Sequence, residues 1–218
     1  MPDQRTLTDL ADRVLTSVSQ PTSARTAPGL YRELLRLLAD GQPVTLARLA
    51  AASGQPAETV ERAVANWPDT EYDDQGRITG YGLTLTPTPH RFTVNGTQLY
   101  AWCALDTLFF PAVIGRPACV ESPCHATGTP VCLTVDPAAG VTALDPATAV
   151  VSIATPERAT SVRTEFCDLG HFFATPQAGR DWQARHPGTS LLCVADAYEV
   201  SRPLSDALLD ATGPASCC

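Results

Sequence analysis

The sequence has 218 residues, a formal net charge of −8 and a pI of about 4.9, and 44% of its residues are hydrophobic. This apolar fraction is sufficient for a folded core. The acidic charge argues against a surface that collects nucleic-acid phosphates or anionic lipid headgroups. No apolar run reaches the roughly 18 residues of a transmembrane helix, and the first residues do not resemble an export signal. We therefore expect a cytoplasmic protein with neither a nucleic-acid nor a membrane partner.

Eight cysteines are present in this chain. In the absence of an export signal, we expect reduced thiols rather than a disulfide framework. A single cysteine is usually a small buried apolar residue, but reduced thiols are also available for chemistry.

Residues 1–82 are predicted to form a helical, winged-helix-like domain. Apolar residues recur at helical spacing from Thr6 to Asn66. The segment VTLARLAAASGQPAETVERAVANW has a helix-turn-helix outline, with a turn at Ser53 and Gly54. The following EYDDQGRITGYGLTL predicts a wing hairpin that turns between Asp74 and Gly76.

The charges of this module do not favour DNA binding. The outward face of the second helix carries Glu58 and Glu61, and the wing carries Glu71, Asp73 and Asp74. Phosphate groups would repel these carboxylates. We interpret the module as a packing domain without DNA contact, and keep a metal-responsive repressor as the alternative.

Residues 83–218 read mainly as strands, so the predicted fold class is α+β: a mixed core of antiparallel β-sheets with flanking helices follows the N-terminal module. The boundary is placed between residues 80 and 86. Asn95-Gly96 is a strong hairpin signal. Strands are expected in RFTVNGTQLYAWC, PVCLTVD, AVVSIAT and LLCVADAYEV, and helices at 176–185 and 203–211.

A carboxylate follows a thiol by three residues in the most apolar part of the chain, YAWCALDTLFFPAVIG at 100–115. Cys103 and Asp106 at this spacing share one face of a helical turn. A carboxylate raises the pKa of a neighbouring thiol, so the pair does not resemble an activated protease cysteine. A buried Asp106 can instead carry a proton near neutral pH.

A second group, Cys119, Cys124, His125 and Cys132, offers ligand types that zinc accepts. Structural zinc sites usually pair their ligands in two short knuckles. The spacing here does not follow that pattern, and His125 is interpreted as a loop residue.

Soft thiolates select soft metals, and a metal already bonded to carbon also needs a proton at that carbon. This chemistry points to an organomercury substrate. The blocks LYAWCALDTLFFPAVIG, SPCHATGTPVCLTV, EFCDLGHFFAT and DWQARHPG resemble the alkylmercury (organomercurial) lyases, and the likeness extends to about Val200.

The resemblance implies that the carbon–mercury bond of R–Hg⁺ is cleaved by protonolysis to R–H and Hg(II), in mercury detoxification. It implies an active site of Cys103, Asp106 and Cys167, which also hold the product Hg²⁺, in a catalytic domain spanning 83–218. It further implies a structural role for Cys124. Cys119 and Cys132 are additions to the family motif and are interpreted as core residues. Cys103 is expected to give its proton to Asp106 first, because the two are near neighbours.

The same resemblance implies no organic cofactor and no resident metal. The expected partners are the organomercurial substrate, cytosolic thiols and a mercuric reductase that accepts Hg(II), and a monomer is the default state. Cys217 and Cys218 end a turn-prone segment that we expect to be mobile. They are a hypothetical mercury-transfer pair, against the alternative of an unstructured end without function. A winged-helix mercury sensor and a thiol scavenger without turnover are the rival functions.

Overall fold

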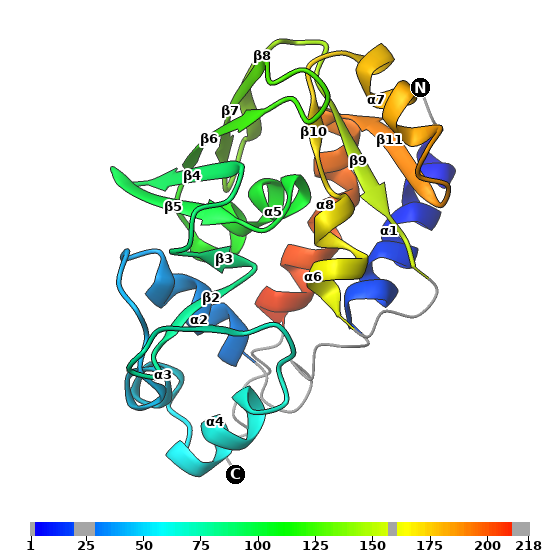
Figure 1. Cartoon of the computed structure of the whole chain (residues 1–218). Coiled ribbons are helices and arrows are strands. Elements are labelled where there is room, and N and C mark those ends of the chain that lie inside the picture. The colour runs from blue at the N-terminus through cyan, green and yellow to red at the C-terminus, as the bar shows by residue number, and fades with distance from the viewer. Residues whose placement is uncertain (1–2, 20–28, 157–160, 211–218) are drawn as a thin grey trace.

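The computed structural model describes residues 3–19, 29–156 and 161–210 (Figure 1). Cys217 and Cys218, the predicted mercury-transfer pair, lie outside these residues. The helices are α1 Gln4–Ser19, α2 Leu30–Leu38, α3 Leu46–Ser53, α4 Ala57–Val64, α5 Ala104–Ile114, α6 Val162–Glu165, α7 Pro176–Gln183 and α8 Val194–Asp210, with a 3₁₀ turn, η2, at Cys167–Leu169. The strands are β1 Glu71–Tyr72, β2 Ile78–Tyr81, β3 Leu83–Thr84, β4 His90–Val94, β5 Thr97–Ala101, β6 Ala118–Pro123, β7 Pro130–Asp136, β8 Gly140–Asp145, β9 Val150–Ala154, β10 Phe172–Phe173 and β11 Thr189–Cys193.

The N-terminal helices have the predicted helix-turn-helix arrangement. The Thr45 side chain accepts a hydrogen bond from the Arg48 N–H at the start of α3, and Gly54 ends this helix in a left-handed conformation. The β1–β2 hairpin that follows turns through Gly76, as predicted. In Figure 1, α2, α3 and α4 gather below the end of the sheet that contains β2 and β3.

The α+β fold class is confirmed. One antiparallel sheet has eight strands in the order β1-β2-β3-β5-β4-β6-β7-β8, and a second has three in the order β10-β9-β11. The predicted Asn95-Gly96 turn joins β4 to β5, with both residues at positive φ. The β1–β2 hairpin therefore continues into the large sheet through β3, which pairs with β5.

The prediction for the C-terminal part was partly wrong. LLCVADAYEV was expected to be a strand, but β11 ends at Cys193 and α8 begins at Val194. Pro203 lies inside α8 instead of opening a helix. Residues buried in α8 recur at helical spacing, and this packing against α5 outweighs the cost of the internal proline. These buried residues are Val194, Ala197, Val200, Ser201, Leu204 and Ser205.

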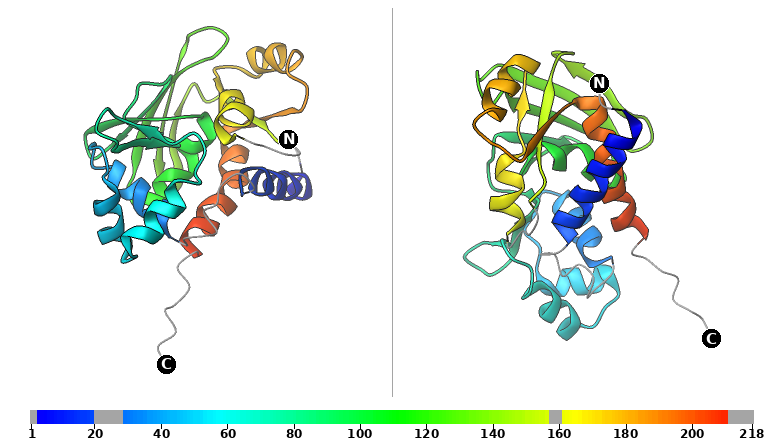
Figure 2. Two further views of the ribbon diagram at one scale, coloured as in Figure 1. Left: turned by 60° about the horizontal axis from the view of Figure 1, so that its bottom comes forward. Right: turned by 90° about the vertical axis from the view of Figure 1, so that its right-hand side faces the viewer.

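Helix α5 is the centre of the core. It packs on one face of the large sheet and against α8, which α1 covers on its other side (Figure 2). Of its residues, all except Ala112 are buried. Among the helices of the described residues, none has both the length and the apolar composition needed to cross a membrane.

The interpretation of Cys119 and Cys132 as core residues is wrong. Burial alternates strictly along β6, and Cys119 takes an exposed position. Cys132 is exposed on β7 in the same way. Because successive side chains of a strand point to opposite faces, their buried neighbours Val120 and Leu133 fill the core side instead.

Three of the chain's histidines lie together beside the small sheet. The rings of His125 and His171 stack at 3.8 Å, and His186 stacks on Trp182 at 3.9 Å. Burial, together with His125 and His186, lowers the pKa of His171 to about 4. Burial also lowers the pKa of His90 to about 3. The folded state therefore favours the neutral form of both rings.

We expect acid to destabilise the protein through these histidines. A histidine with a lowered folded-state pKa binds fewer protons than in the unfolded chain, so its stability is lost as pH falls from about 6.5 towards 4. His171→Phe keeps a stacking ring but cannot titrate. Between pH 7.5 and pH 5, urea denaturation should show that the variant loses less free energy of unfolding than the wild type, by up to about 2 kcal/mol. Equal losses in the two proteins would contradict the lowered pKa.

Candidate active site

Cys103 and Asp106 meet at the first turn of α5. Cys103 is the N-cap residue, and its backbone N–H donates to Oδ2 of Asp106 at 3.2 Å. In return, the Cys103 sulfur accepts from the backbone N–H of Asp106, which completes a capping box. The predicted proximity of the two side chains is therefore confirmed, and the two reciprocal hydrogen bonds fix their relative positions.

The backbone of Gly170 brings Cys167 to the same place. Cys167 opens the η2 turn, and the Gly170 carbonyl at the end of this turn accepts a hydrogen bond from the Ala104 N–H at 2.9 Å. Gly170 also contacts Cys103 so closely that a Cβ there would lie 2.8 Å from the Cβ of Cys103. The two thiol-bearing segments are thus docked backbone against backbone.

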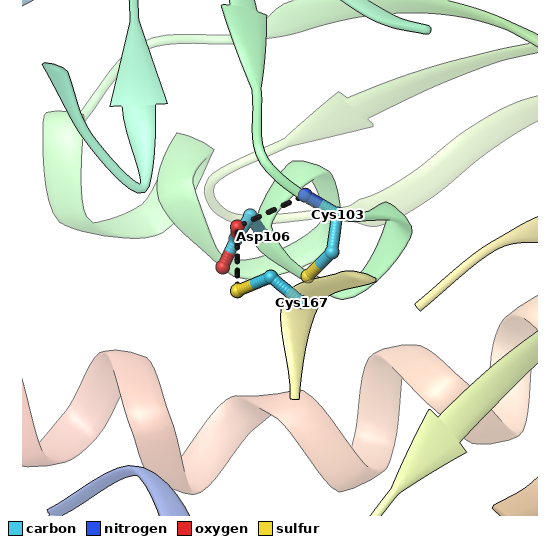
Figure 3. A group of neighbouring side chains, drawn as sticks. All are labelled: Cys103, Asp106 and Cys167. Carbon is cyan, nitrogen blue, oxygen red and sulfur yellow. Dashed lines mark hydrogen bonds between the residues drawn. The ribbon is translucent and has the colours of Figure 1, made fainter. Parts of the chain in front are cut away.

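The three side chains form one compact, buried cluster (Figure 3). The two sulfurs and a carboxylate oxygen all lie within 4.8 Å of one another, and Cys167 Sγ donates to Oδ2 of Asp106 at 3.8 Å. Within the part of the chain that the structure describes, this is the one group of three or more such side chains that could hold a metal ion. The geometry offers two soft ligands and a carboxylate to a single ion.

Burial sets the protonation of this cluster. It raises the pKa of Asp106 to about 7, against the opposing effect of hydrogen bonds from Cys103 and Cys167. The hydrogen bond to Cys103, together with burial, raises the pKa of Cys167 well above its usual value. Burial also raises the pKa of Cys103, but the same hydrogen bond opposes that rise. Both thiols therefore hold their protons at neutral pH until a metal displaces them.

A polar network joins Trp102, the neighbour of Cys103 in the chain, to Arg163 of α6, the helix that precedes Cys167. The Arg163 guanidinium lies over the Trp102 ring, 4.8 Å from its centre. Glu71 accepts hydrogen bonds from Trp102 Nε1 at 3.0 Å, from Arg163 and from Thr84. Burial alone would raise the pKa of Glu71, but the hydrogen bonds from Thr84 and Arg163 hold it below its usual value. Sequence reasoning missed this network, since its members are remote in the chain.

The N-terminal module contacts this network through aromatic rings. Tyr81 of β2 packs edge-on against Trp102 at 5.5 Å, and Tyr31 of α2 packs edge-on against Tyr81 at 5.2 Å. Trp67, just after α4, stacks on Tyr81 at 5.3 Å. The helical module is therefore packed against Trp102, the residue that precedes Cys103.

The alternative zinc group is not assembled. Cys124 is buried, whereas Cys119 and Cys132 are exposed, and His125 stacks on His171. The described residues contain a metal-capable group of three at Cys103, Asp106 and Cys167 alone.

Comparison with known proteins gives the family. The model of the alkylmercury lyase family matches residues 83–206, and the model of the helix-turn-helix domain of alkylmercury lyase matches residues 9–82. This chain belongs to the alkylmercury lyase family. The resemblance found in the sequence is confirmed, and the enzyme is a carbon–mercury lyase.

Relatives of the lyase match it over most of their length. The alkylmercury lyase of Streptomyces lividans is 56% identical over 96% of this chain and 97% of its own. That of Staphylococcus epidermidis is 53% identical over 87% and 88%, and that of Pseudomonas putida 45% identical over 83% and 85%. The crystal structure of the mercury-bound form of MerB2 shares the fold, with a TM-score of 0.72 at 22% identity over 94% of this chain and 100% of that one.

Gly170→Ala should damage both the site and the fold of the lyase. The new Cβ would lie 2.8 Å from Cys103 Cβ and 3.3 Å from Cys103 Sγ. Because this region is buried, we expect a loss of about 1–3 kcal/mol in the free energy of unfolding and about a 100-fold loss in kcat/KM. Urea denaturation and product release measure the two effects.

Gly179→Ala is a matched control for this variant. Its Cβ would meet Val150 and Leu191 at 3.0–3.1 Å, so it also strains a packed contact, but it adds nothing to the contact with Cys103. We expect a change in stability, whose sign depends on how far Val150 and Leu191 give way, with unchanged kcat/KM. Equal activity losses in the two glycine variants would contradict a specific role of Gly170 in placing Cys103.

Proposed function

We propose that this chain cleaves organomercury cations by protonolysis, with Cys103 and Cys167 as the sulfur ligands and Asp106 as the proton carrier. The observation that carries the proposal is the buried cluster of two thiols and one carboxylate, whose ligand atoms lie within 4.8 Å of one another. Thiolates bind a soft metal, and a carboxyl group with a pKa near 7 can both accept and release a proton at neutral pH.

The first step is a thiol exchange at mercury. The substrate arrives as R–Hg–SR′, in which R′S⁻ comes from a small cytosolic thiol. Cys103 bonds to mercury, the Hg–SR′ bond breaks, and the proton of Cys103 leaves with the carrier as R′SH. This order leaves Cys167, whose thiol is hydrogen-bonded to Asp106, for the step that needs the proton.

The second step is the cleavage itself. Cys167 bonds to mercury and gives its proton to Asp106, to which its thiol is hydrogen-bonded. This route differs from the expectation that Cys103 gives its proton to Asp106. A third ligand increases the electron density on mercury and weakens the Hg–C bond. Asp106 then protonates the carbon, R–H leaves, and Hg(II) stays on the two sulfurs.

The proposal extends to the surroundings of the reaction. Each turnover consumes the protons of both cysteine thiols, and two incoming thiols restore them when they remove Hg(II). The proposed context is therefore a thiol-rich cytoplasm, with a mercuric reductase as acceptor. We further propose a monomeric enzyme that uses no organic cofactor and in which mercury is substrate and product rather than a resident metal.

The test is to incubate the purified protein with phenylmercuric acetate and an excess of a monothiol, and to follow benzene by gas chromatography. We expect benzene over many turnovers. Mercury binding without benzene would contradict the proposal and leave the scavenger or sensor function.

A further inference from the structure

A second pair of thiols lies on the face of the large sheet opposite to α5. Cys119 on β6 and Cys132 on β7 are both exposed. The two strands are antiparallel neighbours, in which Cys119 stands opposite Thr134, and Glu121 opposite Cys132. Both thiols therefore point to the same side of the sheet, and the inward-facing pair of Val120 and Leu133 separates their two cross-strand pairs. Cys119 Sγ lies 4.0 Å from Thr134 Oγ1, so its side chain is oriented towards β7.

The diagonal relation of the two thiols limits what they can do. Diagonal neighbours on adjacent antiparallel strands have Cα atoms about 7–8 Å apart, with their Cβ atoms somewhat closer. A disulfide requires Cα atoms within about 7 Å, so the register disfavours a direct S–S bond. A metal ion bound between the two sulfurs replaces the single S–S bond with two metal–sulfur bonds and so spans a longer distance. The diagonal spacing of the two cysteines suits this longer bridge.

The surrounding side chains favour a metal that needs only two sulfur ligands. Thr93 and Thr134 flank Cys119, and Glu121 and Asp145 flank Cys132. Glu121 pairs with Arg91 at 3.4 Å. Zinc prefers four ligands, usually nitrogen and sulfur, and none of the described residues directly opposite the two thiols on the neighbouring strands is a histidine. Hg(II) is satisfied by two thiolates in a linear arrangement, and the nearby carboxylates favour a cation.

We propose that Cys119 and Cys132 form a second Hg(II) site on the outer face of the sheet, separate from the reaction centre. Hg(II) arrives as a complex with two monothiols. Two Hg–S bonds to the carriers break, two form to Cys119 and Cys132, and the two cysteine protons leave with the carrier thiols. No oxidant or reductant is needed. The site goes beyond the proposed reaction, because it requires no cleavage of a carbon–mercury bond.

The protonated state of Cys132 fits this exchange. Burial, Glu121 and Asp145 raise the pKa of Cys132, so its thiol keeps its proton at neutral pH until mercury displaces it. Two thiols on adjacent strands act as a chelate, because binding to the first sulfur gives the second a high effective concentration. A chelate retains mercury against a monothiol that would remove it from a single cysteine.

The test measures mercury retained by the full chain. Wild type, Cys119→Ser, Cys132→Ser and the double variant are loaded with HgCl₂ in an excess of 2-mercaptoethanol, desalted, and analysed for mercury per chain. Cys193→Ser removes a partly exposed thiol of β11 and is the matched control. Circular dichroism verifies that each variant is folded, and benzene release from phenylmercury reports on the reaction centre separately.

We expect the wild type and Cys193→Ser to retain about one mercury ion more per chain than the two single variants, and the single variants to equal the double variant. Benzene release should be the same in all of them. Wild-type retention in either single variant would overturn the second site. Single variants that fall halfway to the double variant would also overturn it, since they would show two independent thiols. Failure of the reaction itself would appear as absence of benzene in the wild type.

Discussion

Asp106→Asn should lose turnover but retain the binding of organomercury. The amide oxygen of Asn can still accept the hydrogen bond from the Cys103 N–H, so the start of α5 is preserved. The amide cannot carry a proton from Cys167 to carbon. General acid–base groups contribute about 10²–10⁴-fold to rates, and we expect a loss in that range. Benzene release measures turnover, and mercury per chain measures binding.

The same variant should be more stable than the wild type at alkaline pH. Burial raises the pKa of Asp106 from 3.8 to about 7. The folded state then binds the proton of Asp106 more tightly than the unfolded chain does. The protonated carboxyl group therefore contributes its full stabilisation below pH 3.8, and this contribution is lost as pH rises to about 7. The whole shift is worth on the order of 4 kcal/mol.

Urea denaturation at two pH values tests this linkage. Asp106 also contributes to the raised pKa of Cys103 and of Cys167, but burial keeps both thiols protonated up to pH 8. The difference between the two proteins over this pH range therefore reports on Asp106. From pH 5.5 to pH 8 the advantage of Asp106→Asn should grow by about 2 kcal/mol. A difference that does not change with pH would contradict the raised pKa, and wild-type turnover in the variant would exclude Asp106 as the proton carrier.

The part of the site that is local in sequence could be predicted from the sequence. Cys103 and Asp106 are three residues apart, and the first turn of a helix brings such residues together whatever the rest of the fold does. Cys167 was placed only through the family resemblance. Its position depends on the hydrogen bond between the Ala104 N–H and the Gly170 carbonyl. No sequence pattern predicts a contact between these two distant segments.

Charged residues far apart in the chain were interpreted without their partners. Glu71 counted as one more acidic residue of a wing that disfavours DNA, yet it binds Trp102 and Arg163 beside the site. Such a role depends on how β1 joins the large sheet, which is set by tertiary packing. Composition and local pattern carry no information on it.

Strand alternation, by contrast, does predict which face of the sheet the cysteines of β6 and β7 occupy. Val120, Leu133 and Val135 define the buried face of β6 and β7, and the alternation then places Cys119 and Cys132 outside. The start of α8 at Val194 is harder to predict from the sequence. The run LLCVADAYEV contains β-favouring residues, and only the helical spacing of the buried residues beyond Val194 distinguishes its second half from a strand.

Cys103→Ser should abolish cleavage without unfolding the protein. Serine is a preferred N-cap residue, so its hydroxyl can replace the sulfur as acceptor for the Asp106 N–H at the start of α5. A hydroxyl is a poor ligand for a soft metal. We expect benzene release to fall at least about 10³-fold, with an unchanged or higher free energy of unfolding. Loss of folding in this variant would contradict the capping argument.

Cys167→Ser should stop the reaction one step later. Cys103 can still exchange with the carrier thiol, but mercury receives no second sulfur and Asp106 receives no proton from Cys167. The expected product is a phenylmercury adduct on Cys103, which intact-protein mass spectrometry detects as a retained phenyl group. The double variant Cys103→Ser/Cys167→Ser is the control for adducts on the other cysteines. If Cys167→Ser instead holds no more phenylmercury than the double variant, Cys167 binds mercury first, and the order of the two thiols is reversed.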